Sequence, residues 1–281
     1  MHRGTVRAWR AGLAVMAAAA VAAGAEGGGS TEIVIDGSTT VGPIAKAFAE
    51  HYMKEHPGVS ITVSESGSGN GAKSLINGVC QIAAMSRFMH DTEIKAAVEK
   101  QILPVPHAVA IDGIAIVVHP ANPVKDLKLE QIRDIYAGRI TNWNQVGGPN
   151  TKIVAIGRES NSGTFESFQS LVMKGEKIGS SVESVGSNGA IRQRVQSTPA
   201  AIGYVGLGFA DRTVKALSVN GVACERQTVV TGRYPVGRPL FLFTNGYPEL
   251  GSHLHALVTL HLHKKGQEII EALGYVPLTD Y

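Results

Sequence analysis

The nine residues GRESNSGTF at positions 157–165 decide the fold class of this chain. They follow the apolar run KIVAI (152–156), which predicts a strand, and they precede apolar residues spaced as on one helix face. The pattern is therefore strand, loop and helix N-terminus. A helix N-terminus offers free N–H groups and the positive end of the helix dipole, so it favours an anion. This loop is a candidate site for a small tetrahedral oxyanion through Arg158, Ser162, Gly163 and Thr164.

Two other segments repeat this arrangement, DGSTTVGP at 36–43 and ESGSGNG at 65–71. Either segment alone is explained as well by ordinary helix capping, because Ser, Thr and Asn cap helices in most proteins. Three such turns, one of them with an arginine, favour a shared anion site, since ligands of open α/β sheets bind where strand ends meet helix N-termini. The added candidate hydroxyls belong to Ser38, Thr39, Thr40 and Ser68.

Two charged residues are further candidates. Arg87 follows the predicted strand at 81–85 and could hold an anion bidentately, although a surface or interdomain salt bridge explains it equally well. Asp112, with Gly113 after it, interrupts a long apolar stretch and is either a capped turn or an acceptor for a protonated ligand oxygen. Because phosphate carries a proton near neutral pH and sulfate does not, a buried carboxylate would favour phosphate.

Strand and helix patterns alternate along the rest of the chain. Strands are expected at 32–36, 59–63, 81–85, 105–119, from 152 and at 202–205; helices are expected at 43–56, 70–77, 91–101, 129–136, from 164, near 188–196, at 252–263 and at 266–273. This alternation predicts a layered α/β fold with a mostly parallel sheet. The segment SGNGAKS at 68–74 looks like a P-loop, but Ala72 separates Gly71 from Lys73, which disfavours nucleotide binding.

The first 25 residues predict a signal peptide. Three arginines precede an apolar run at 11–23, and Ala23-Gly24-Ala25 supplies a cleavage site before a Gly-rich linker at 26–30. The apolar run is shorter than the roughly 20 residues of a membrane-spanning helix. The first cysteine is Cys80, far from the cleavage site, so no lipid-accepting cysteine is expected there. The sequence predicts a soluble, exported and periplasmic protein.

Charge and composition exclude several function classes. The chain has 26 Lys and Arg against 23 Asp and Glu, net +3, and removing the three leader arginines leaves 23 of each. A net charge of zero argues against nucleic acid or an anionic membrane surface as partner. No nucleophile motif, cofactor motif or metal-ligand spacing is found, and the C-terminal histidines lack i,i+4 pairing. Cys80 and Cys224 could pair or remain buried thiols.

Six segments together resemble the periplasmic phosphate-binding proteins, the solute receptors of phosphate ABC importers. They are DGSTTV (36–41), GSGNG (67–71), IAAMSR (82–87), DGIA (112–115), ITNWN (140–144) and the loop at 157–165. The resemblance implies a class II periplasmic binding-protein fold, with two α/β lobes joined by two crossover strands and the ligand in the cleft. Lobe I would comprise 31–112 and 237–281, lobe II 113–236, with hinges near 112–113 and 236–240.

The resemblance also implies roles for individual residues. Phosphate would be bound by Thr39, Thr40, Ser68, Arg158, Ser162, Gly163 and Thr164. Some family members carry an aspartate acceptor where this chain has Ser86. Either Asp112 replaces that acceptor, or selectivity for phosphate over sulfate is weaker or differently built. Arg87, beside Ser86, would add a second cation.

The function implied is binding of inorganic phosphate and its delivery to the membrane permease of an ABC importer. The protein would be a monomer, would need no cofactor and would not be an enzyme. The alternatives are a receptor for sulfate, molybdate or tungstate, a secreted phosphatase on the same scaffold, and an exported sensor or adhesion module.

Overall fold

The computed structural model describes residues 31–279, so the predicted signal peptide (1–25) and linker (26–30) lie outside the described residues. Its helices are α1 Gly42–Glu55, α2 Ser68–Ile76, α3 Asp91–Glu99, α4 Leu129–Tyr136, α5 Gly163–Phe168, α6 Asn188–Gln196, α7 Arg226–Val230, α8 His253–Thr259 and α9 Lys264–Ala272. Its strands are β1 Thr31–Gly37, β2 Val59–Ser64, β3 Ile82–Met85, β4 Pro104–Val118, β5 Asp126–Leu127, β6 Val154–Arg158, β7 Glu183–Val185, β8 Ala201–Gly206, β9 Lys215–Ala216, β10 Ser218–Val219 and β11 Gly237–Asn245.

The main sheet is mixed, with strand order β2-β1-β3-β11-β4-β8-β6-β7, and β9 also pairs with β4. The pairs β1–β2, β1–β3, β6–β7 and β6–β8 are parallel, as the alternation of elements predicts. However, β4 and β11 are antiparallel to each other and to their other neighbours. The prediction of a mostly parallel sheet was wrong at this point, because the chain leaves one half along β4 and returns along β11.

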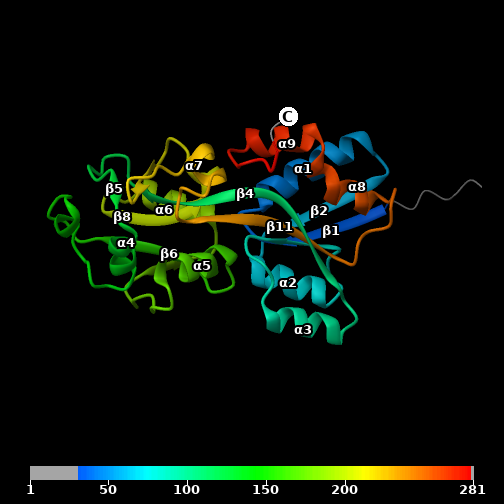
Figure 1. Cartoon of the computed structure of the whole chain (residues 1–281), viewed down its shortest axis with the longest axis horizontal. Helices are drawn as coiled ribbons and strands as arrows, with labels where there is room; N and C mark the ends of the chain where they lie inside the picture. Colours follow the sequence, from blue (N-terminus) through cyan, green and yellow to red (C-terminus); the bar gives the residue numbers. More distant parts are fainter. Residues whose placement is uncertain (1–30, 280–281) are drawn as a thin grey trace, which may run out of the picture.

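Figure 1 shows two α/β halves joined by β4 and β11. The half built on β1, β2 and β3 is called the first lobe, and the half built on β6, β7 and β8 the second lobe. Separate hydrophobic clusters stabilise them, with Phe48 and Leu242 in the first and Tyr136 and Tyr204 in the second. Val276 belongs to the second cluster although it lies near the C-terminus, because it bridges to Ile111. The predicted two-lobed fold class is confirmed, while the residue boundaries of the lobes stay a prediction.

Local sequence explains most element boundaries. Helix α1 has Pro43 in its first turn, where no backbone donor is needed, and buries Ile44 and Phe48. Helix α5 is shorter than its apolar pattern suggests, since the chain continues as a π-helical turn, Gln169–Met173, that buries Val172. The interruption that the sequence predicts near Asp112 in the long apolar stretch is absent, because β4 runs through it.

Strand β4 is continuous through Asp112 because β11 lies alongside it. The residues at the expected break have direct partners in β11: Gly113 is opposite Gly237, and Asp112 is opposite Arg238. The two predicted hinge segments are therefore neighbours in one antiparallel ladder.

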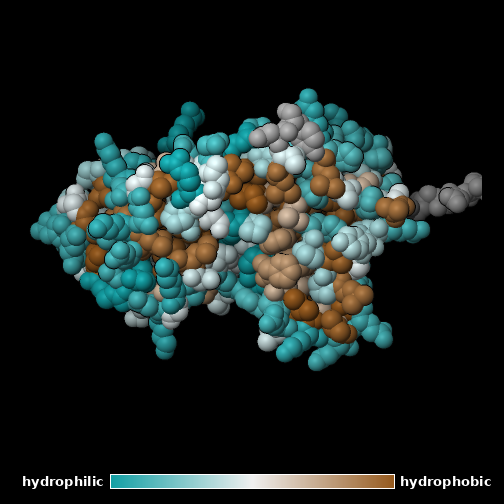
Figure 2. Space-filling view, in the orientation of Figure 1, coloured by the Kyte–Doolittle hydropathy of each residue, from teal (hydrophilic) through white to brown (hydrophobic). Residues whose placement is uncertain are grey.

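Other expectations concern cysteines, membranes and metals. Cys80 and Cys224 are free thiols in different hydrophobic clusters, and burial raises the pKa of Cys80 to about 12. None of the helices within residues 31–279 has the length and apolar character needed to cross a membrane. The same residues contain no group of His, Cys, Asp and Glu arranged to hold a metal ion. Figure 2 shows the face of the molecule seen in Figure 1, where hydrophobic residues gather over the middle of the second lobe, near the junction of the lobes, and over α2 and α3, while hydrophilic residues surround them.

Candidate functional site

The turns that carry candidate hydroxyls meet at the interface of the two lobes. Thr40, before α1 of the first lobe, and Thr164, in α5 of the second, have their Oγ1 atoms 2.9 Å apart. Asn188 of α6 donates to Thr40 Oγ1 at 2.9 Å and to Thr39 Oγ1 at 3.0 Å. All four side chains are buried. The predicted convergence of separate turns on one point is confirmed, and the lobes are in contact across it.

Two serines shape these turns from within. Ser38 Oγ accepts hydrogen bonds from the backbone N–H groups of Thr40 (3.1 Å) and Val41 (3.3 Å). Ser162 Oγ accepts in the same way from Thr164 (3.2 Å) and Phe165 (3.3 Å) as the N-cap of α5. Capping of this kind holds the first turn of a helix in place. Ser38 and Ser162 therefore position the threonine hydroxyls that face each other.

Ser68 of the second turn and Ser86, which follows β3, form a pair at the same interface. Ser68 Oγ lies 3.3 Å from Ser86 Oγ and accepts from the Ser86 N–H at 3.1 Å. A Cβ atom placed on Gly163 would overlap Ser68 Oγ and lie 2.7 Å from Ser86 Oγ, closer than carbon and oxygen approach without strain. Glycine is therefore required at position 163 for the lobes to approach this closely. The structure is that of a closed cleft.

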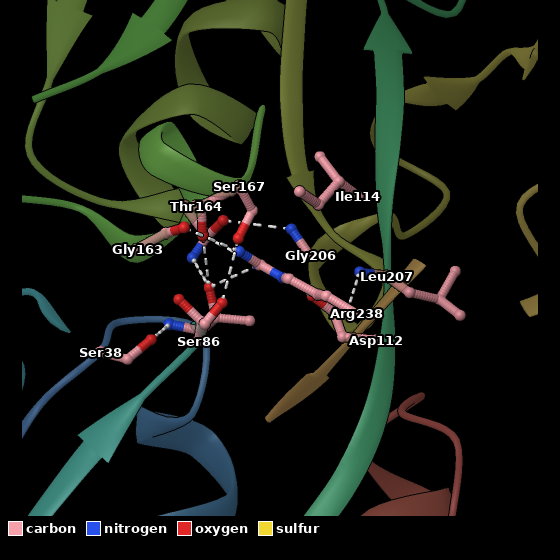
Figure 3. Close-up of polar contacts among 12 residues, drawn as sticks. Ser38, Ser86, Asp112, Ile114, Gly163, Thr164, Ser167, Gly206, Leu207 and Arg238 are labelled. Carbon is pink, nitrogen blue, oxygen red and sulfur yellow. Dashed lines mark hydrogen bonds and ion pairs between the residues drawn. The ribbon is translucent and has the colours of Figure 1, made fainter. Parts of the chain in front are cut away.

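Arg238 is the side chain that links these groups, and Figure 3 shows it extending from β11 between Asp112 and Thr164. Its Nε and Nη2 atoms donate to Asp112 Oδ2 at 3.1 and 2.9 Å. Nη2 also donates to Thr164 Oγ1 at 2.9 Å and to Thr40 Oγ1 at 3.4 Å, and Nη1 to the Gly163 carbonyl at 3.3 Å. A single buried guanidinium therefore contacts both lobes and the crossover strand β4.

Asp112 is fully buried and both of its oxygens are engaged. Oδ1 accepts from the Leu207 N–H at 2.9 Å, and Oδ2 accepts from Arg238. Burial raises the pKa of Asp112, because an isolated charge is costly in the interior, while Arg238 and the Leu207 amide oppose that rise. Asp112 thus lies at the interface, as predicted, but its charge is directed at Arg238.

Arg158 is buried near this cluster but is not in hydrogen-bond contact with the other predicted residues. Its guanidinium donates to the carbonyl oxygens of Val185 (Nε, 3.3 Å) and Gly186 (Nη2, 2.7 Å). Within residues 31–279 no carboxylate lies at ion-pair distance from it. Burial lowers the pKa of Arg158 to about 10, and the positive charge of Arg238 adds to the effect. Arg158 remains protonated at neutral pH, so it is a buried cation without a paired anion.

Arg87 is held by two carboxylates. Its Nη1 and Nη2 atoms donate to the two carboxylate oxygens of Glu93 at 2.7 Å each, and its Nε lies 2.5 Å from Glu166 Oε2. Burial disfavours its charge, but the two carboxylates outweigh burial and raise the pKa of Arg87. The sequence left open an anion contact or a surface or interdomain salt bridge, and the structure has salt bridges, one of them between the lobes.

Sequence reasoning missed two residues of this cluster, Asn188 and Arg238. Asn188 opens a helix after a strand and a serine-containing turn, β7 to α6, which is the pattern that identified the other turns. Arg238 lies in the second predicted crossover, where no local pattern marks it as a site residue.

Known proteins of similar sequence point to a family of ligand-binding proteins. Residues 22–256 match the family model described as the PBP superfamily domain. The phosphate-binding protein PstS of Bacillus subtilis is 32% identical over 252 residues, covering 89% of this chain and 82% of the relative.

Two solved structures are also similar. One is described as a phosphate ABC transporter substrate-binding protein of Clostridium perfringens with bound phosphate; its TM-score is 0.82 at 34% identity, covering 89% of this chain and 100% of that one. An ABC-type phosphate transport receptor of Vibrio cholerae has a TM-score of 0.71 at 32% identity, covering 87% and 99%. Fold, site and sequence agree, and the chain belongs to the PBP superfamily and, within it, to the family of the PstS phosphate-binding proteins.

Proposed function

We propose that this protein binds inorganic phosphate in the cleft between its lobes and delivers it to an ABC-type permease. The observation that carries the proposal is an excess of buried positive charge where the lobes meet. Arg158 and Arg238 are 3% and 6% exposed, and the fully buried Asp112 forms an ion pair with Arg238 and with no other cation among residues 31–279. An unpaired buried charge is costly unless a ligand neutralises it. An anion held between Arg158, Arg238 and the facing hydroxyls would do so.

The chemistry of the cluster suits a tetrahedral oxyanion. Hydroxyls of Thr39, Thr40, Ser68, Ser86 and Thr164 can turn their hydrogen atoms toward an acceptor. Charge-assisted hydrogen bonds contribute about 1.5–3 kcal/mol each, and a micromolar site needs about 8 kcal/mol in total. Several such bonds therefore suffice, even after the cost of removing water from the anion.

The two-lobed fold supports a closing mechanism. In the proposed division, residues 31–112 and 237–281 form one lobe and residues 113–236 the other. Hinge bending near 112–113 and 236–240 would open the cleft, since these paired segments are the crossovers. Asp112 and Arg238 lie on those segments, so the proposed hinge and the ligand site share residues.

The wider setting is inferred from the family. The relatives are named phosphate-binding proteins, and the Clostridium perfringens and Vibrio cholerae structures are described as components of ABC-type phosphate transport. The protein would act as an exported, soluble and monomeric receptor in the periplasm, without a lipid anchor and without catalysing a reaction. Sulfate, molybdate or tungstate as ligand, and phosphatase activity, are not favoured by these relatives.

The proposal is tested by freeing the full chain of bound ligand and then titrating it with inorganic phosphate in a calorimeter. We expect binding at micromolar concentration or tighter, with sulfate at equal concentration displacing little of the phosphate. The same titration with sulfate alone compares the two oxyanions directly. Absence of phosphate binding, or tighter binding of sulfate, would contradict the proposed function.

A further inference from the structure

A second charged cluster joins the lobes beside the hydroxyl site. Arg87 follows β3 of the first lobe, His90 precedes α3, and Glu93 lies in α3. Glu166 extends from α5 of the second lobe and is in contact with both Arg87 Nε, at 2.5 Å, and His90 Nε2. These contacts cross between the lobes, so they can exist only when the cleft is closed.

The first lobe holds its side of the cluster ready. Glu93 accepts two hydrogen bonds from Arg87 and one from the His90 backbone N–H at 2.9 Å. Both partners belong to the first lobe, so Arg87 keeps its position and a carboxylate partner whether or not Glu166 is present. Opening of the cleft removes Glu166 without leaving Arg87 unpaired, and this makes the crossing contact reversible.

Burial strengthens the crossing contact. The side chains of Arg87 and Glu166 are 8% and 20% exposed, well below the values for an ordinary surface pair. They border a groove of about 550 Å³ whose walls include the apolar residues Phe88, Leu171 and Phe241. Solvent and salt screen a partly buried ion pair less than an exposed one.

The cluster is connected directly to the turns of the site. Arg87 is the next residue after Ser86, and Glu166 lies two residues after Thr164 in the same helix. Between them, Ser167 Oγ donates to the Ser86 carbonyl at 3.3 Å. Separation of Arg87 from Glu166 would therefore also separate Ser86 from Gly163 and Thr164. Movement at the cluster and opening of the site are one event.

We propose that Arg87, His90 and Glu166 form an interlobe latch that slows release of the bound anion. The latch rests on the proposed function, since it acts on the same closed cleft. Arg87 and Glu166 are positioning residues that stabilise the closed form and do not contact the ligand. Because the latch exists only after closure, its loss acts on the dissociation rate more than on the association rate.

The latch and direct charge effects predict opposite results for one substitution. Glu166→Gln removes a negative charge close to an anion site and releases Arg87 from one carboxylate. If Arg87 bound the anion, or if only long-range attraction mattered, this change would strengthen phosphate binding. If the latch holds the lobes together, the same change weakens it. The sign of the effect separates the two mechanisms.

The experiment measures release of inorganic phosphate from the full chain, by mixing protein loaded with radiolabelled phosphate with excess unlabelled phosphate. We expect Glu166→Gln to raise the dissociation rate about five- to tenfold, as for loss of a partly buried ion pair across an interface. Arg87→Gln should have a similar effect. The dissociation rate of the double variant should be at most about twofold higher than that of the faster single variant, because each substitution removes the same contact between Arg87 and Glu166.

Glu176→Gln is the matched control, because Glu176 pairs with Arg139 and Arg133 within the second lobe. Its dissociation rate should stay within about twofold of the wild type, since it crosses no interface. Urea unfolding confirms that each variant is folded. If Glu166→Gln does not fold, His90→Gln serves instead, with an expected increase of about two- to fivefold.

An unchanged or slower release from folded Glu166→Gln protein would overturn the latch. So would a double variant in which the two effects multiply. Failure of the wild-type protein to bind phosphate would overturn the proposed function itself, which keeps the two outcomes distinguishable.

Discussion

Replacing Arg238 by methionine removes a guanidinium that joins both lobes to β4. Methionine keeps much of the length and apolar volume of the side chain, so the change is mainly one of charge. It removes both hydrogen bonds to Asp112 and those to Thr164, Thr40 and the Gly163 carbonyl. Stability and binding are therefore expected to fall together, for separable reasons.

The loss of stability follows from Asp112. This carboxylate is 0% exposed and would retain, within the described part of the chain, the Leu207 N–H as its single hydrogen-bond donor. Breaking a buried ion pair from one side costs about 3–5 kcal/mol, a large share of the roughly 5–15 kcal/mol that stabilises a typical domain. Asp112→Asn in addition to Arg238→Met removes the stranded charge and keeps an acceptor for Leu207. The double variant should recover most of the lost stability.

Binding should not recover in the double variant. The anion site would still lack the Arg238 guanidinium, whose Nη2 atom lies 2.9 Å from Thr164 Oγ1. Because a charge-assisted hydrogen bond contributes about 1.5–3 kcal/mol, we expect phosphate affinity to fall by more than about tenfold in both variants. Urea unfolding measures stability and calorimetry measures affinity. A single variant within about 1 kcal/mol of the wild type, or a double variant that binds phosphate as the wild type does, would refute the reasoning.

Three further outcomes are expected. Arg158→Ala should weaken phosphate binding at least about tenfold by calorimetry while the protein stays folded, and unchanged affinity would remove Arg158 from the site. Gly163→Ala should hold the lobes apart, because its Cβ would overlap Ser68 Oγ. Small-angle X-ray scattering in the presence of phosphate should then give a larger radius of gyration for the variant than for the wild type. An equal radius of gyration would disprove this. Burial lowers the pKa of His107 and His261 below the ordinary histidine value. Just below that ordinary value, the two histidines are therefore protonated in the unfolded chain but still neutral in the folded protein. The free energy of unfolding should therefore decrease as pH falls below about 6.5, and equal urea midpoints at pH 7.5 and 5.5 would contradict this.

Local sequence was enough to predict the turns of the site. Strand, polar turn and helix follow one another in a short stretch, so the backbone groups that bond to Ser38 and Ser162 are only two or three residues away. The hydrophobic periodicity that defines the elements is equally local. Parallel strands then bring the turns to one edge of each lobe, and this made their meeting predictable before any contact was known.

Residues whose role depends on distant partners could not be assigned in the same way. Arg87 has the same sequence context whether it binds an anion or a carboxylate, and Glu166, 79 positions later, decides the matter. The sequence left both interpretations open for that reason.

Asp112 is a residue whose burial could be predicted from the sequence but whose partner could not. Its predicted role as acceptor rested on a carboxylate inside an apolar stretch, and burial was predicted correctly. What the carboxylate faces depends on the register of β11, which places Arg238 directly opposite at a separation of 126 residues. One residue of slip would move the guanidinium to the other face of the sheet. Whether the Asp112 carboxylate is neutralised within the protein therefore depends on strand pairing between the two crossovers.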